Sequence, residues 1–122
     1  MSTPQDKKPS RDVGTEVIFE NDVIRMWNME LQPGEASHYH RHEYDYFYVY
    51  ITPSRIAVHR IGEPDVVREY QANFVQYNVV GDGIEHSITN VGEARHQQII
   101  VELKRKSASD VSLPPENNDR FG

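Results

Sequence analysis

The sequence predicts an all-β domain, a sandwich or barrel built from short strands. Short stretches of alternating or β-branched and aromatic residues follow one another, separated by turn residues at roughly 8–12-residue intervals, which is typical of all-β domains. No stretch shows a sustained helical period with capping residues at its ends. The sequence also contains no internal repeat.

The expected strands follow directly from these alternating stretches. Residues 23–31 alternate most clearly, because Trp27, Met29 and Leu31 share one face of an extended chain with Val23 and Arg25. Turn residues then separate each strand from the next. The strands expected are 17–19, 23–31, 37–42, 45–52, 55–61, 66–70, 74–80, 86–90 and 96–104.

The length of 122 residues fits a single domain. Residues 1–14 are polar and contain two prolines, so we expect a disordered N-terminal arm. Residues 15–106 form the predicted barrel. Residues 107–122 contain Pro114-Pro115 and are expected to form a loose C-terminal tail.

Composition excludes several classes of function. The chain has no cysteine, which rules out disulfides and thiolate metal sites and favours a cytoplasmic location. Its N-terminus lacks the apolar segment of a secretory signal, and no apolar run is long enough to cross a membrane. The net charge is −6 without a basic face, so we expect neither nucleic acid nor a membrane as partner. Motifs for covalent catalysis or phosphate binding are also missing.

Histidines provide the strongest functional signal. His38, His40 and His42 occupy alternate positions and would share one face of a strand. Asp45 follows closely, and His86 lies much further along the chain. Imidazoles with a carboxylate and no cysteine are typical of a divalent metal site that takes Fe, Mn, Ni, Zn or Cu. Metal affinity is then expected to fall as the pH drops through the ordinary histidine range near 6.5.

Two motifs give this pattern a family likeness. Gly34, five residues and then His40-Arg41-His42 match the opening of the first cupin motif, and Gly83, His86 and Asn90 match the second. Over residues 15–104 the chain therefore resembles the cupin superfamily, and within it small single-domain bacterial cupins. The resemblance implies a double-stranded β-helix (jelly-roll) barrel that holds a metal with His40, His42 and His86.

The first motif can be aligned in two ways. Only two residues separate His42 from Asp45, fewer than is usual between the histidines and the carboxylate of the motif. The alternative pairs His38 with His40 and restores that spacing, but it breaks the spacing from Gly34. Both alignments share His40. Asp45 is either a fifth candidate ligand or an acceptor that orients a ligating histidine.

The resemblance implies a metal-dependent enzyme, a dioxygenase, isomerase or lyase, that acts on a small oxygenated metabolite. The alternative is a non-catalytic module that binds a metal or small molecule, and no catalytic residue is assigned from the sequence. Arg25 and Arg60 are the candidates for pairing with an anionic substrate.

A stripe of tyrosines suggests self-association. Tyr44, Tyr46, Tyr48 and Tyr50 alternate, and they face outward if Asp45 points into the barrel. Tyrosine is common at interfaces that are partly exposed to solvent, so the sequence predicts a homodimer. Of the remaining histidines, His59 is expected outside the metal site and His96 at a solvated or interface position.

Overall fold

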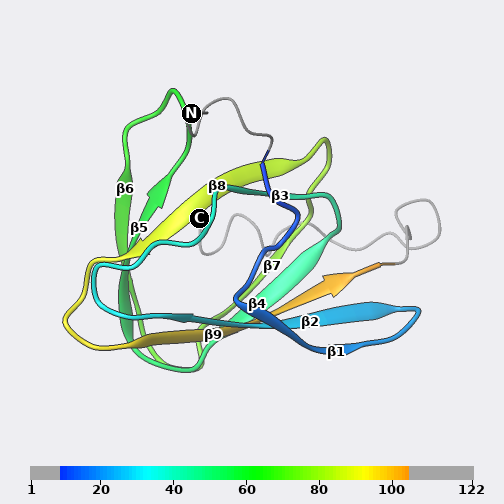
Figure 1. Cartoon of the computed structure of the whole chain (residues 1–122), viewed down its shortest axis with the longest axis horizontal. Coiled ribbons are helices and arrows are strands. Elements are labelled where there is room, and N and C mark those ends of the chain that lie inside the picture. Colours follow the sequence, from blue (N-terminus) through cyan, green and yellow to red (C-terminus); the bar gives the residue numbers. More distant parts are fainter. Residues whose placement is uncertain (1–8, 105–122) are drawn as a thin grey trace, which may run out of the picture.

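The protein folds into two antiparallel β-sheets that face each other (Figure 1). The computed structural model describes residues 9–104, and every regular element within that range is a β-strand. The five-stranded sheet contains, in spatial order, β1 (Glu16–Glu20), β2 (Ile24–Leu31), β9 (His96–Leu103), β4 (Tyr46–Tyr50) and β7 (Val75–Asn78). The four-stranded sheet contains β3 (His40–His42), β8 (Ile84–Asn90), β5 (Ser54–His59) and β6 (Val66–Tyr70). The prediction of an all-β jelly-roll barrel is confirmed. Between residues 9 and 104, no helix is long and apolar enough to cross a membrane.

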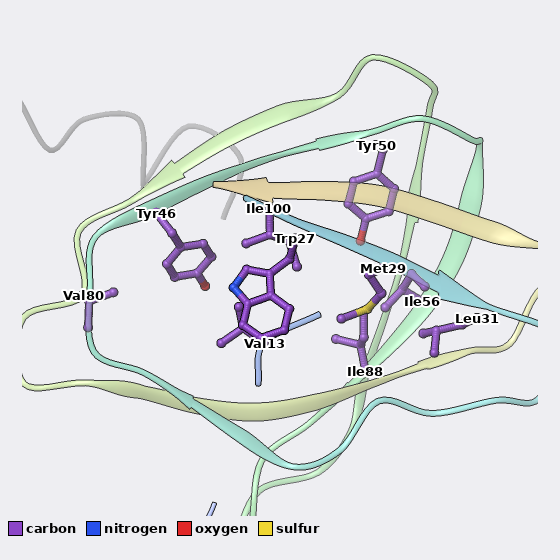
Figure 2. Packing of buried hydrophobic residues seen from close by; sticks show 10 residues of the cluster. All are labelled: Val13, Trp27, Met29, Leu31, Tyr46, Tyr50, Ile56, Val80, Ile88 and Ile100. Carbon is purple, nitrogen blue, oxygen red and sulfur yellow. The ribbon is translucent and has the colours of Figure 1, made fainter. Parts of the chain in front are cut away.

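The core lies between the two sheets. On β2 the alternation predicted from the sequence is confirmed, because Trp27, Met29 and Leu31 are all buried. Figure 2 shows Met29 beside Ile56 and Ile88, which belong to the opposite sheet. Burial of each such side chain stabilises the fold by about 1.5–3 kcal/mol, so the alternation of β2 contributes directly to sheet packing.

A strap at the N-terminus connects the two sheets; it comprises residues 9–15 and is the dark blue segment of Figure 1. The backbone of Ser10 donates to Tyr39 and accepts from Arg41, at 2.9 and 2.8 Å. Further along, Thr15 donates to the backbone of Asn28 on β2 at 2.7 Å. Between these anchors Val13 is completely buried. This packing places residues 9–14 of the expected arm against the barrel, whereas the tail at 107–122 lies outside the described residues.

The expected orientation of the tyrosine stripe is wrong. Tyr46 and Tyr50 are each 3% exposed and belong to the core, and Tyr48 packs against it. A shift of one residue in a strand exchanges its two faces, so a wrong assignment of Asp45 reverses the whole stripe. The carboxylate of Asp45 instead accepts a hydrogen bond from the backbone N–H of Val80 at 2.9 Å. The observed orientation of β4 is favoured because it buries three aromatic rings. The opposite orientation would point the Asp45 carboxylate inward, and the carboxylate would lose its hydration.

The position expected for His96 is also wrong. Its side chain is completely buried at the start of β9. One ring nitrogen bonds to the hydroxyl of Ser54 at 2.7 Å, and the other bonds to the side-chain oxygen of Gln98 at 2.6 Å. These partners satisfy both polar atoms of the ring, which allows burial at low cost.

Candidate metal centre

Three histidines from two neighbouring strands converge on the interior. His40 and His42 share one face of β3, and His86 lies on β8 directly opposite His40 in the antiparallel register. Their candidate ligand atoms all lie within 4.8 Å of one another. The ring centroids are 4.7 to 5.2 Å apart, and each pair of rings meets nearly edge to face. Alternation along one strand and pairing across two strands therefore bring residues 40, 42 and 86 together.

Two glycines help to set this register. Gly83 precedes β8 and has a φ of +122°, a conformation that L side chains rarely adopt. A Cβ atom at this position would collide with the guanidinium of Arg41, which also bonds to Glu85 at 2.9 Å. On the other side, Gly34 has a φ of +86° and donates its N–H to the backbone of Asn90 at 2.8 Å. Gly83 thus allows close packing of the β8 turn against Arg41 of β3, and Gly34 ties the turn after β2 to the end of β8.

Burial keeps all three imidazoles neutral at pH 7. It lowers the pKa of His40 to about 4 and that of His86 to about 3, and it lowers the pKa of His42 well below the ordinary value. Each charged ring would also repel its neighbours. The neutral ring is the form that binds a metal ion. The cluster therefore needs no deprotonation at neutral pH before it can act as a ligand set.

Hydrogen bonding prepares His40 for ligation. Its Nδ1 lies 2.8 Å from the backbone carbonyl of His38, and a carbonyl can only accept, so Nδ1 carries the proton. The lone pair is then on Nε2. A fixed outer hydrogen bond of this kind is the usual device by which proteins orient a ligating imidazole.

The other two imidazoles lack such partners. The Nδ1 atoms of His42 and His86 are both buried, and neither has a hydrogen-bond partner among residues 9–104. Buried polar atoms without partners are rare in native proteins, and each costs roughly 1–3 kcal/mol. A cation bound by the cluster would give both rings a favourable interaction that the protein groups do not supply. The donor set therefore fits a divalent metal ion.

A cavity of about 60 Å³ lies next to the cluster. All three histidines line it, together with Tyr46, Tyr48, Gln98 and Ile100. The ring of Tyr46 stacks on His42 with 3.8 Å between centroids and 10° between planes. This volume has room for a few water molecules or a small ligand. The site thus combines a candidate metal centre with a small, largely aromatic chamber.

Sequence reasoning did not identify the tyrosines as cavity residues. Tyr46, Tyr48, Tyr50 and Tyr70 all line the chamber. Three of them share the period of two that the sequence displays, so the signal was present, but it does not say which face is buried. Val13 also lines the cavity, and nothing in the polar N-terminal sequence distinguishes it.

The structure does not bring the other two candidate ligands to the cluster. His38 is exposed, and only its backbone carbonyl contacts the imidazole of His40. The carboxylate of Asp45 bonds to the N–H of Val80, and its second oxygen lies 3.5 Å from the hydroxyl of Tyr77. Asp45 therefore fixes the end of β7 to the start of β4. As metal ligands, His38 and Asp45 remain predictions.

The remaining candidates from the sequence have clear positions. The side chain of Arg25 donates to the buried carboxylate of Glu102 at 2.8 Å, so its charge is already paired. His59 bonds to Asp65 at 2.8 Å near the surface, away from the cluster. Arg60 is exposed directly after β5. Of the two candidate anion-binding arginines, Arg60 is the one with no ion pair to any acidic residue between 9 and 104.

Solved structures with a similar backbone include several cupins. A cupin domain from Bordetella pertussis Tohama I has a TM-score of 0.68 and 21% identity, covering 81% of this chain and 99% of that one. An RmlC-like cupin family protein with a double-stranded β-helix fold from Methanocaldococcus jannaschii has a TM-score of 0.61 and 13% identity, with 85% and 94% covered. An uncharacterized conserved protein with a double-stranded β-helix domain from Klebsiella pneumoniae has a TM-score of 0.60 and 16% identity, with 87% and 90% covered.

Neither a family model nor a curated protein matches the sequence. At these identities the structural similarity establishes the fold, which is the double-stranded β-helix of the cupins. Fold and site together define a cupin-fold protein with a possible metal centre of three histidines.

Proposed function

We propose that this protein binds a divalent metal ion through His40, His42 and His86 and is a metal-dependent enzyme for a small oxygenated metabolite. The observation that carries this proposal is the convergence of three neutral imidazoles beside a cavity. When bound, such a metal supplies Lewis-acid polarisation of a substrate oxygen or activation of water or dioxygen. Dioxygenase, isomerase and lyase reactions all use chemistry of this kind.

The residues around the cluster support it in separate ways. The carbonyl of His38 orients the ring of His40, and the stacked ring of Tyr46 restricts the ring of His42. Aromatic side chains, Tyr46, Tyr48 and Tyr50 of the opposite sheet, form much of the other wall of the chamber. Ligands held rigidly by surrounding side chains are a common arrangement in metal-dependent enzymes.

One observation favours a second candidate function, a non-catalytic binding module. None of the cavity-lining residues between 9 and 104 is an aspartate or glutamate. The chamber therefore offers no carboxylate as a general base, and the metal with the tyrosine hydroxyls would have to move every proton. A module that binds a metal and a small ligand does not need such a base.

Titration with Co(II), followed by visible absorption, tests the metal site. The wild-type protein is expected to bind one Co(II) ion, and His42→Ala and His86→Ala are each expected to lose most of the affinity, because a ligand is removed. His59→Ala is the matched control, since this imidazole is already bonded to Asp65. Equal binding by all four proteins would contradict the assignment. Turnover by the metal-loaded protein on a panel of small hydroxy and oxo compounds would then separate enzyme from binding module.

A further inference from the structure

The end of β5 lies beside the histidine cluster. In the antiparallel pairing of β5 with β8, Val58 is opposite Ile88 and His59 is opposite Ser87. Continuing this register by one residue places Arg60 opposite His86. Val58 lines the cavity, and residues two apart on an extended chain share a face, so Arg60 continues the face of Val58 just beyond the end of β5 and beyond the residues that line the cavity.

Two hydrogen bonds hold this part of the chain near the cluster. The N–H of Ile61 donates to the hydroxyl of Tyr39 at 3.2 Å, and Tyr39 directly precedes His40. The N–H of Glu63 donates back to the carbonyl of Arg60 at 3.0 Å and closes the turn. The residue that follows Arg60 is therefore tied to the segment that leads into β3.

The guanidinium of Arg60 is available to a ligand. Arg60 is exposed and forms no ion pair with any acidic side chain in the described range 9–104. Arg25 and Arg41, by contrast, are paired with Glu102 and Glu85 at 2.8 and 2.9 Å. Arg68 is also without an ion pair in that range, but it is opposite Ile56 on β5, about 13 Å further along the strand at the usual rise per residue.

We propose that Arg60 binds the substrate's carboxylate, and that the substrate is a small carboxylic acid with a hydroxyl or carbonyl oxygen next to that group. This inference rests on the proposed metal site. The planar guanidinium matches a carboxylate in a two-pronged ion pair. The adjacent oxygen then faces the histidine cluster, because the register of β5 and β8, continued by one residue, sets Arg60 opposite His86. The cavity of about 60 Å³ admits only a small acid, and no acidic lining residue repels it.

Binding of glycolate to the Co(II)-loaded protein tests this role, with glycolamide as its uncharged counterpart. Calorimetry gives the affinities, and the visible spectrum of Co(II) reports whether the ligand reaches the metal. We expect glycolate to bind more tightly than glycolamide. Arg60→Gln should weaken glycolate binding by about 10- to 100-fold, the range for loss of a charged hydrogen-bonding partner. The affinities for glycolamide and for Co(II) should not change.

Arg55→Gln is the matched control, because Arg55 lies on β5 on the face opposite to that of Val58 and Arg60. Its one ion pair among the described residues, to Glu69 at 3.8 Å, is on the surface, so this variant should bind glycolate like the wild type. Equal glycolate affinity in Arg60→Gln and wild type would overturn the role of Arg60 and leave the metal site intact. Wild-type protein that takes up Co(II) but binds no glycolate would likewise overturn the role of Arg60 and leave the metal site intact. Failure of the wild type to take up Co(II) would instead overturn the proposed function, and this inference with it.

Discussion

At the scale of single residues, Tyr46 has a double role. Its ring is buried in the core and also stacks on His42, so it both stabilises the fold and restricts a candidate ligand. The hydroxyl contributes less to either role than the ring. The two contributions can be separated because phenylalanine preserves the ring.

Replacement of Tyr46 should therefore depend on what replaces it. Tyr46→Ala is expected to lower the free energy of unfolding by about 3–5 kcal/mol, as for other large aromatic truncations. It should also weaken metal binding by roughly 10- to 100-fold, the typical cost of losing a residue that supports a ligand. Tyr46→Phe should keep metal affinity within about twofold of the wild type. Urea unfolding and Co(II) titration measure the two effects, and a metal affinity unchanged in Tyr46→Ala would contradict the supporting role.

Buried histidines should make the metal-free protein sensitive to mild acid. An unfolded histidine takes up a proton near pH 6.5, whereas burial lowers the pKa of His40 to about 4 and that of His86 to about 3 in the folded state. Between about pH 6.5 and these lowered pKa values, the unfolded chain binds more protons than the folded protein does. The free energy of unfolding is then highest above about pH 6.5 and falls as the pH decreases toward 4.

Urea unfolding of the metal-free protein at about pH 7.5 and about pH 5.5 measures this loss, since most carboxylates remain charged in that window. His86→Gln should show a smaller decrease. A flat profile would contradict neutral burial of the cluster. The same low pKa values revise the expectation from the sequence, because the metal affinity of the folded protein should persist below pH 6.5 and fall only toward pH 4.

At the scale of elements, Asn90 fixes the end of β8. Its side-chain amide donates to the carbonyls of Leu31 and Ala94, both at 2.9 Å, and its oxygen accepts from the N–H of Gly92 at 2.9 Å. The residue is completely buried. It therefore ties β8 to the end of β2 and to the turn before β9, which gives the motif asparagine a structural role.

Asn90→Ala should consequently be among the more damaging single changes. It removes three hydrogen bonds and leaves buried backbone groups unpaired, at roughly 1–3 kcal/mol for each group that water cannot reach. Chemical unfolding measures the loss. Thr89→Ala, a change of the half-buried neighbour on the opposite face of β8, is the control and should cost much less. Equal stability of the two variants would show that the Asn90 network contributes little.

At the scale of the whole molecule, patterns within single strands predicted more of the structure than could be predicted about pairing between distant strands. The alternation around Trp27 and the spacing of His40 and His42 are properties of single strands, and both can be read directly from the sequence. The return of His86 to the same site came from a resemblance, because pairing of β8 with β3 is a contact between distant parts of the chain.

The errors have the same physical origin. A period of two defines two faces but not which one is buried, so the tyrosines of β4 were placed on the wrong side. His96 looked solvated because its partner Ser54 comes from a different sheet. Since three of the four tyrosines that suggested a homodimer, Tyr46, Tyr48 and Tyr50, line the cavity, self-association stays a prediction with little of that support.

The central claim is that residues 40, 42 and 86 form a metal site, and metal content tests it most directly. Elemental analysis would compare the wild type with His40→Ala and His59→Ala, all purified without chelator or affinity metal. The claim predicts nearly one equivalent of a divalent metal in the wild type and His59→Ala, and almost none in His40→Ala. A wild type that holds no metal even after reconstitution, or a His40→Ala variant that keeps its full content, would contradict it.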